Sequence, residues 1–390
     1  MNGLKLEFKP TSKFSAKAVR QPERIGGLEG ALSKSSLLVD SDYVIKLFRK
    51  LESGINPEIE IGRFLTEVAD FPNTPAMLGS AELIEGEKRS AIAIVHAQIG
   101  NQGDAGTVTA AYLGRLLEEQ RLLATGGQRR ESEEEIAYLR LVSQIGRRTA
   151  ELHLALASAS GSPDLTPEPI RPPDVARWIA TTVQSAEHAL QNLRQRRGSL
   201  SEADRAMVDA LAAQQAALRD RLNELMTPDT RGRSQRLHGD FHLGRALVVK
   251  DDVFITGFGG DLRLPVEERR RKAPAARDVA HMIWSIETAS LAARDRALHL
   301  APDENARLDE ALTEWVDRAT TAFLTAYGEF MSDTEIWPAD PVAAQRMVDF
   351  FLLEKAFDVL ETELVQRPEA APATLARILR ILSQPTREAA

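Results

Sequence analysis

The chain has 390 residues, with 49 Lys and Arg against 57 Asp and Glu, and it contains no cysteine. The missing cysteine excludes disulfide frameworks, thiolate metal sites and cysteine nucleophiles. A net charge of −8 without a basic domain argues against nucleic acid as the main partner. Apolar runs such as Ala91–Val95 fall far short of the roughly 18 residues that a membrane span needs, and the first fourteen residues lack the apolar stretch of a secretory signal. We therefore expect a cytoplasmic globular protein.

The first part of the chain mixes short strands with one helix. Residues 36–47 predict two strands joined at Asp40–Asp42, where turn-forming residues cluster. Asn56 is a candidate N-cap with Pro57 at the first helical position, and the following residues show helical spacing. Two further strands, 81–85 and 90–95, flank Gly86 as the arms of a hairpin. Together these elements predict a compact α+β lobe.

Beyond residue 105 the pattern is mainly helical. The spacing predicts helices over 110–124 and 133–157, a proline-rich connection, and a helical hairpin over 174–226 broken near Gly198. Two short strands around the Lys250–Asp252 turn follow, and helices continue from residue 275. The resulting expectation is an N-terminal extension (1–24), a small β-rich lobe (25–104) and a large helical lobe (105–390) that contains a catalytic-type loop at 236–261.

The strongest chemical motif is His238–Gly239–Asp240, which precedes the predicted hairpin. This arrangement is typical of a phosphotransferase catalytic loop, in which the aspartate accepts the proton of the acceptor hydroxyl. We assign Asp240 and His238 to the catalytic loop on this basis. His238 and His242 could also be read as metal ligands, but they flank a strand-like loop rather than one helix face. Ordering of the loop by both histidines is the simpler interpretation.

A second candidate pair is Lys46, on a predicted strand, with Glu60 on the helix that follows. Kinases orient a phosphate-binding ammonium with such a pair; the alternative is a surface lysine at a strand end. A loose glycine cluster at Gly26, Gly27 and Gly30 is weak support for a phosphate-covering loop. We interpret the ERRRK run at 268–272 as a solvated face. The aspartates in turn contexts are explained by side-chain capping: Asp164, Asp174, Asp251 and Asp252.

Four segments together resemble the maltokinase family, including the maltokinase-like domains fused to trehalose synthases. They are IKLFRKLESGINPEIEIGRFL (45–65), GNQGDA (100–105), HGDFHLGRAL (238–247) and LPVEERRRKAPAARDVAHM (264–282). The family is similar to aminoglycoside phosphotransferases and eukaryotic-like kinases. The resemblance implies an α+β, bilobal, protein-kinase-like fold that transfers the γ-phosphoryl group of ATP to the anomeric hydroxyl of maltose, with Mg²⁺.

The chain departs from that family at the positions that the resemblance assigns to the metal. The family's DFEGE loop reads Gly257–Phe258–Gly259–Gly260–Asp261, so the expected ligand is Gly257. The glutamine that follows HLG is Arg245. Mg²⁺ requires oxygen ligands in near-octahedral geometry, and these two changes remove two donors and add a positive charge. We therefore doubt that Mg²⁺ binds.

Other departures fall at positions that the resemblance assigns to nucleotide and sugar. An EQSN-type phosphate loop reads ALSK and ends in Lys34. A glutamine near the hinge is His96, the tryptophan that closes the NQGDAW motif is Gly106, and an arginine after RDVA is Trp284. Lys46, Glu60 and Asp240 persist, and we expect Lys34 and Arg245 to add positive charge facing any bound phosphates.

Three hypotheses remain open. The first is a maltokinase-like pseudokinase with little or no Mg-ATP phosphoryl transfer, acting as a binding or regulatory partner of trehalose synthase or another enzyme of trehalose, maltose or glycogen metabolism. The second is an active maltose 1-kinase in which Arg245 and Lys34 replace the metal's charge and Asp240 remains the base. The third is a structural domain without ligand. ATP and maltose are candidate ligands; nucleic acid and membrane are not expected partners.

Overall fold

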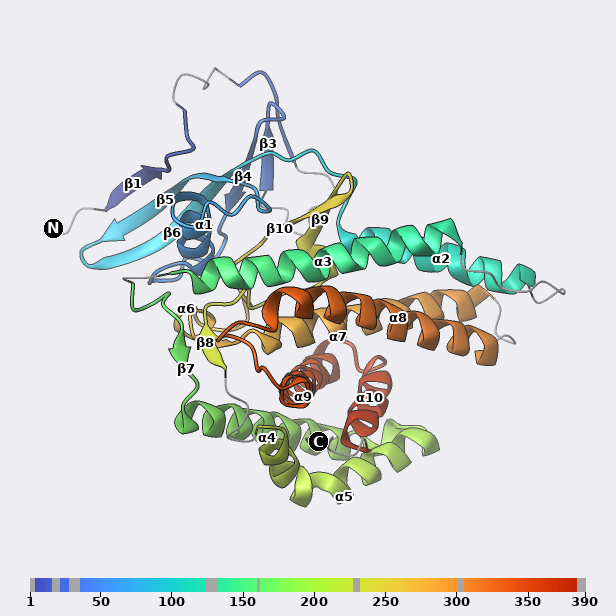
Figure 1. Ribbon diagram of the computed structural model, residues 1–390. Helices are drawn as coiled ribbons and strands as arrows, with labels where there is room; N and C mark the ends of the chain where they lie inside the picture. The colour runs from blue at the N-terminus through green and yellow to red at the C-terminus, as the bar shows by residue number, and fades with distance from the viewer. Residues whose placement is uncertain are drawn as a thin grey trace. The chain divides into compact units, whose positions relative to one another are not determined.

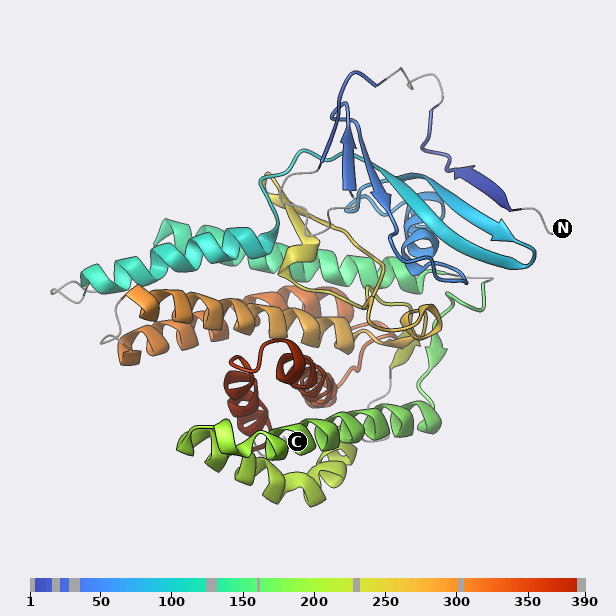
Figure 2. The same cartoon turned by 180° about the vertical axis from the view of Figure 1, so that it is seen from behind.

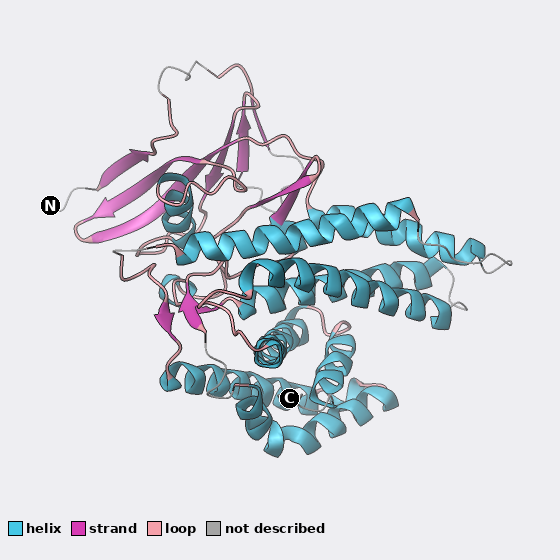
Figure 3. Cartoon of the chain, in the orientation of Figure 1, coloured by secondary structure: helices cyan, strands magenta, loops and turns pink. Residues whose placement is uncertain are grey.

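The computed structural model describes residues 4–15, 22–27, 36–123, 132–159, 162–226, 232–300 and 305–383. The chain divides into two compact units, each of which is described by itself. Unit 1 comprises residues 1–166, 235–272 and 285–331, and unit 2 comprises residues 167–234, 273–284 and 332–390. Both units are therefore built from segments far apart in the sequence. The fold is an α+β arrangement with a β-rich N-terminal region and a mostly helical remainder, as predicted (Figure 3).

The β-rich part of unit 1 is a six-stranded antiparallel sheet in the order β1-β5-β6-β4-β3-β2. Its strands are β1 (Lys5–Pro10), β2 (Ile25–Gly27), β3 (Ser36–Val39), β4 (Tyr43–Leu47), β5 (Met77–Glu85) and β6 (Lys88–Ala97). Both predicted hairpins are confirmed. Asp40 and Ser41 turn the first one with positive φ angles of 53° and 69°, and Gly86 turns the second with φ 60°. Short polar residues and glycine adopt this backbone region most readily.

The N-terminal strand β1 was not predicted, because residues 1–24 were expected to lie outside the lobe. The structure pairs β1 with β5 from Lys5 opposite Ile84 to Pro10 opposite Gly79. The sequence KLEFKP alternates charged and apolar side chains, which suits one sheet face of each kind. The apolar side chains of this strand are exposed, so the sequence contains no apolar run of the kind that predicts a buried strand.

Helix α1 (Pro57–Glu67) covers one face of the sheet. It begins as predicted: the Asn56 side chain accepts hydrogen bonds from the backbone N–H groups of Glu58 (2.9 Å) and Ile59 (3.3 Å). These bonds satisfy N–H groups that a helix start leaves without partners. Ile59 packs in a buried cluster with Met77, Ala91 and Ile94 of the sheet. The cap and this cluster fix which way the glutamates of α1 point.

The helical part of unit 1 contains α2 (Ala105–Leu123), α3 (Glu133–Ala157), α8 (Asn305–Met331) and the C-terminal part of α7 (Ala276–Leu300). Helices α3 and α8 run side by side in both views (Figures 1 and 2). Gly146 allows their close approach, because a Cβ at this position would lie 2.3 Å from the Phe323 carbonyl oxygen. The remaining elements of unit 1 are the short helix η3 (Leu243–Arg245), the hairpin β9 (Ala246–Val249) and β10 (Asp252–Ile255), and α6 (Val266–Arg269).

Unit 2 contains the predicted helical hairpin together with the C-terminal helices. Its elements are α4 (Pro172–Gln195), η2 (Arg197–Ser199), α5 (Glu202–Leu225), α9 (Pro341–Gln366) and α10 (Ala371–Ser383), with the short strands β7 (Glu168–Pro169), β8 (Arg233–Gln235) and β11 (Ala273–Pro274). Aromatic contact between Trp178 and Phe351, at 5.7 Å between ring centroids, joins α4 to α9. Within the described parts of both units, no helix is long and apolar enough to cross a membrane.

Candidate functional site

Lys46 on β4 forms its ion pair with Glu58, and the predicted pairing with Glu60 is wrong. The Lys46 Nζ lies 2.7 and 2.9 Å from the two carboxylate oxygens of Glu58. A helix turns about 100° per residue, so Glu60 points to the far side of α1 from Glu58. The lysine and the helix were predicted correctly, but the partner carboxylate lies two residues earlier in α1 than the one predicted.

The carboxylate of this ion pair is buried, whereas the Lys46 side chain is 26% exposed. Glu58 is 4% exposed, and burial alone would raise the pKa of its carboxyl, but the charge and hydrogen bonds of Lys46 outweigh burial and lower it. Beside it, burial lowers the pKa of His96, which is therefore neutral near pH 7. The His96 Nδ1 lies 3.3 Å from the Pro75 carbonyl oxygen. The positive charge of Lys46 is therefore balanced by the negative charge of Glu58, and the neutral His96 adds no charge.

Glu60 instead joins α1 to two arginines from distant segments. Its carboxylate lies 2.7 Å from the Nη1 of Arg236 and 2.6 Å from the Nη2 of Arg270. Arg236 is 1% exposed and is the first residue of the loop that carries the HGD motif. Removing a cation from water costs several kcal/mol unless a counter-charge compensates, so Glu60 is the counter-charge that permits this burial. Glu60 therefore orders the loop and makes no contact with Lys46.

The ERRRK run at 268–272 is only partly the solvated face that was predicted. The Arg269 side chain is 1% exposed, donates to the Gly259 carbonyl oxygen at 2.9 Å and pairs with Glu52. Arg270 also pairs with Asp164 at 2.9 Å. Both arginines pair with carboxylates from distant parts of the sequence, so no local pattern could reveal these contacts.

The HGD loop places Asp240 and His238 in different environments. His238 is 1% exposed, its Nε2 lies 2.9 Å from the Thr256 carbonyl oxygen, and its ring contacts those of Phe241 and Phe258. A side chain enclosed in this way orders the loop and has no surface for a substrate, so the assignment of His238 as a catalytic residue is corrected to a positioning residue.

Asp240 is half-buried. His242 accepts a hydrogen bond from the Gly244 N–H at 3.1 Å, which also orders the loop.

Arg245 binds the aspartate that would act as the base. Its Nη2 donates a hydrogen bond to the Oδ2 of Asp240. The same guanidinium occupies the space beside Gly257, because a Cβ at position 257 would lie 3.0 Å from Arg245 Nη1 and 3.2 Å from Arg245 Cδ. The expected metal-ligand position and the expected glutamine position are thus neighbours in space, and the arginine fills the room that a side chain at 257 would need.

The glycine-rich segment 257–260 brings the two parts of the site together. A Cβ at Gly259 would lie 3.3 Å from the Oε2 of Glu58. The charge of Arg245 also contributes to the lowered pKa of Glu58. Lys46, Glu58, Asp240 and Arg245 therefore share one site, and their formal charges sum to zero.

The residues present do not fit a divalent cation. Gly257 supplies no side-chain oxygen, Arg245 adds positive charge, and Asp240 is bound to that arginine. Asp261, the nearest carboxylate along the loop, accepts hydrogen bonds from the backbone N–H (2.9 Å) and Nε (3.0 Å) of Arg263. Across the described ranges, no group of three or more His, Asp or Glu side chains is arranged to hold a metal ion.

The NQGD motif has a structural explanation in this chain. Gln102 and Gly103 exchange backbone hydrogen bonds with Val248 on β9 at 2.8 and 2.9 Å. The Asp104 carboxylate accepts hydrogen bonds from the N–H and hydroxyl groups of Thr107, both at 3.0 Å, at the start of α2. The motif therefore attaches the segment that follows the sheet to the β9–β10 hairpin.

Asp252 was attributed to turn capping, but its carboxylate accepts hydrogen bonds from Arg148 (2.7 and 2.8 Å), Gln144 (2.8 Å) and Asn73 (3.1 Å). It holds the β9–β10 hairpin against α3, and only the fold reveals this role. Lys34, proposed as a phosphate-facing cation, lies outside the described residues, as does Gly30.

Comparison with known proteins identifies the type of fold. No family model matches the chain. It is 29% identical over 186 residues to a glucosamine kinase of Streptacidiphilus jiangxiensis, and 28% identical over 209 residues to a glucosamine kinase of Mycolicibacterium smegmatis. These matches cover 47% and 53% of this chain but only 37% and 46% of the two relatives, less than half of the length of each.

Solved structures extend the likeness to nearly the whole chain. A glucosamine kinase in complex with glucosamine, ADP and inorganic phosphate aligns with a TM-score of 0.72 at 19% identity, over 97% of this chain and 79% of that one. A second crystal form aligns with a TM-score of 0.73. The chain has a kinase-like fold of the aminoglycoside phosphotransferase type. The kinase fold expected from the resemblance is confirmed; the maltokinase family itself is not shown.

Proposed function

We propose that this protein is a pseudokinase of the sugar-kinase type, which binds ligands or partners and transfers phosphate weakly or not at all. One observation carries the proposal: Arg245 binds Asp240 and fills the space beside Gly257. A base must be free to accept the proton of the acceptor hydroxyl, whereas this carboxylate is held by an ion pair.

The electrostatics of the site support the same conclusion. Neutralisation of the transferring phosphoryl group by metal ions lowers the barrier by several kcal/mol, so its loss costs on the order of a thousandfold in rate. The four described charges of the site sum to zero, so the side chains provide no excess positive charge in its place. ATP without a metal carries a large negative charge and would bind poorly to a neutral site.

The relatives and the resemblance suggest two classes of sugar. The similar proteins are glucosamine kinases, which favours an amino sugar, and the sequence motifs resemble maltokinases, which favours maltose. We propose that a retained sugar-binding region serves recognition in sugar metabolism, with trehalose synthase or another enzyme of the trehalose–maltose–glycogen group as a candidate partner.

The alternative is an active ATP-dependent sugar kinase with altered metal use. The exposure of Arg245 favours it: the side chain is 28% exposed, so its guanidinium could turn from Asp240 to a phosphate group. This alternative predicts phosphoryl transfer that depends little on Mg²⁺ and that is lost in Asp240→Asn.

A turnover assay separates the two. The purified protein is incubated with ATP and either glucosamine or maltose, with and without Mg²⁺, beside the Asp240→Asn variant and a glucosamine kinase as positive control. The proposal predicts that parent and variant are equally inactive with both sugars. Turnover by the parent at kinase rates of roughly 1–100 per second, abolished by Asp240→Asn, would overturn it.

A further inference from the structure

Strand β1 presents an unusual apolar face at the edge of the six-stranded sheet. Leu4, Leu6 and Phe8 are 66%, 48% and 69% exposed. Leu6 and Phe8 lie on one face of the strand, opposite Leu83 and Ala81 of β5, and the alternation of a strand brings Leu4 to the same face. No strand among the described residues pairs with the outer edge of β1. An exposed apolar edge strand is a template for pairing with another strand.

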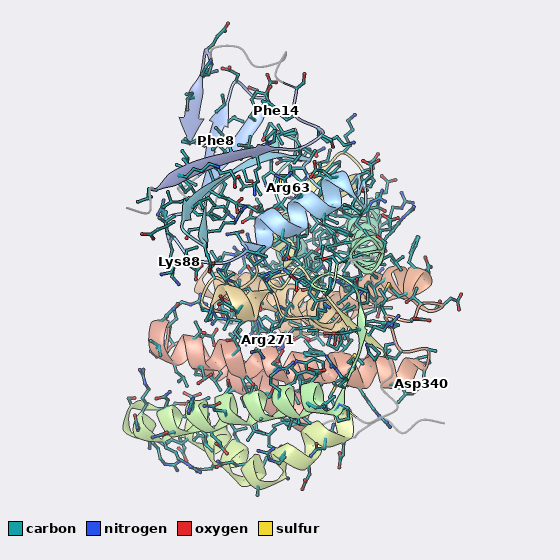
Figure 4. The ribbon with its side chains drawn as sticks, turned by 90° about the vertical axis from the view of Figure 1, so that its left-hand side faces the viewer. Phe8, Phe14, Arg63, Lys88, Arg271 and Asp340 are labelled. Carbon is teal, nitrogen blue, oxygen red and sulfur yellow. The ribbon has the colours of Figure 1, made fainter. Side chains whose placement is uncertain are left out.

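The part of the edge available for pairing ends after Phe8. Arg63 of α1 donates hydrogen bonds to the carbonyl oxygens of Lys9 and Pro10, both at 3.1 Å. Pro10 also lacks an N–H group to donate. Phe8 on the strand and Arg63 on the helix are labelled in Figure 4. The usable segment is therefore residues 4–8, and its centre is Leu6.

The charges on the opposite face select one self-pairing register. In an antiparallel pair of identical strands, residues directly opposite each other share a face. With Leu6 opposite Leu6 of a second copy, Lys5 lies opposite Glu7, and Leu4 lies opposite Phe8. Centring the pair on Lys5 or Glu7 instead places like charges opposite each other, which is destabilising. Centring it on Phe8 requires Lys9 and Pro10, whose carbonyl groups already bind Arg63.

The existing ion pairs leave Lys5 available for this contact. Glu7 lies 3.2 Å from Lys9 and 3.4 Å from Arg89, whereas Lys5 forms no ion pair with any residue that the structure describes. One register therefore joins apolar side chains on one face and opposite charges on the other.

We propose that β1 is a self-association site, at which two copies of the chain pair antiparallel about Leu6 and join their sheets at this edge. A five-residue pairing is small compared with stable interfaces, so the dimer is weak and concentration-dependent. The partner is thus a second copy of the same chain, selected by the alternation Leu-Lys-Leu-Glu-Phe.

The absence of cysteine allows a direct test by disulfide trapping. In the proposed register the Cα atoms at position 6 lie about 4.5–5.5 Å apart, within the range of a disulfide. Leu6→Cys should form a covalent dimer under mild oxidation of the full chain. Ile25→Cys is the matched control, because Ile25 is 61% exposed on β2 at the other edge of the sheet. It should cross-link much more slowly.

The register has its own test. Leu4→Cys and Phe8→Cys should each fail to cross-link on oxidation, because identical positions would lie about 13 Å apart, whereas a mixture of the two should form a disulfide between positions 4 and 8. Sedimentation of the parent chain should show a reversible increase in mass with concentration. The proposal is overturned if the parent stays monomeric throughout, if Ile25→Cys cross-links as fast as Leu6→Cys, or if the mixture cross-links no faster than its components.

Discussion

Arg245 donates a hydrogen bond to Asp240, five residues earlier in the same loop, and thereby occupies the carboxylate that a phosphotransferase would use as its base. The guanidinium also lies where a side chain at position 257 would be. The arginine and the glycine are therefore coupled: the small residue makes room for the large one. This coupling explains why both departures from the kinase pattern occur together.

Asp252 is expected to be important for the stability of unit 1. Asp252→Asn removes a charge that accepts hydrogen bonds from Arg148, Gln144 and Asn73, and hydrogen bonds to a charged group contribute about 1.5–3 kcal/mol. We expect a loss of about that size in the free energy of unfolding, measured by urea denaturation. Asp209→Asn is the control, because Asp209 makes a similar two-bond pair with Arg197 on the surface and should matter little.

The stabilisation that Asp252 contributes should also depend on pH. Burial raises the pKa of Asp252, but the hydrogen bonds that it accepts outweigh burial and lower the pKa below its ordinary value. The unfolded chain therefore binds the proton more readily, so the stabilisation is complete above about pH 4 and is lost as the pH falls further. The stability difference between parent and Asp252→Asn should shrink over that range. A difference independent of pH would contradict this account.

Glu60→Gln should destabilise the protein more strongly. The substitution leaves Arg236, which is 1% exposed, without its counter-charge, and breaking a buried ion pair costs about 3–5 kcal/mol. The midpoint of urea unfolding reports this cost. Adding Arg236→Met to Glu60→Gln should recover part of the lost stability, because the double variant no longer buries an unpaired charge. A cost no larger than that of Glu118→Gln, whose side chain is 63% exposed, would rule out this role of Glu60.

Two helical glycines should respond to alanine in opposite directions. Gly146→Ala places a Cβ against the Phe323 carbonyl oxygen and should force α3 and α8 apart, at a cost of about 3 kcal/mol or more. Gly114→Ala on α2 meets no atom within 4 Å and should stabilise the protein by about 0.5–1 kcal/mol through helix propensity. Thermal unfolding of the two variants measures both effects. Equal changes in the unfolding temperature of the two variants would show that α3 and α8 can move apart at Gly146 without cost.

Much of the fold could be predicted because its signals are local. The turn at Asp40–Asp42, the cap at Asn56 and the hairpin around Gly86 each depend on a few adjacent residues. Strand β1 escaped prediction because its apolar side chains face outward. The division into two units also has no local signal, because each unit combines three segments that are separated in the sequence by segments of the other unit.

The sequence predicted the residues of the site that belong to local motifs, but not the ion pairs that depend on the fold. Local motifs identified Lys46, Asp240 and Arg245. The choice between Glu58 and Glu60 required the phase of α1, which Asn56 and the packing of Ile59 set. The pairing of Glu60 with Arg236 and Arg270 depends on residues about two hundred positions away, which sequence spacing cannot bring together.

The most direct test is the affinity for ATP, measured by calorimetry with and without Mg²⁺, for the parent and for Arg245→Gln combined with Gly257→Asp. Aspartate tolerates the φ of 84° at position 257 better than most residues, and circular dichroism of the double variant is the control for folding. We predict that Mg²⁺ does not strengthen ATP binding by the parent and strengthens it at least about tenfold, or 1.4 kcal/mol, in the double variant. Binding by the parent that Mg²⁺ strengthens as much as in the double variant would contradict it.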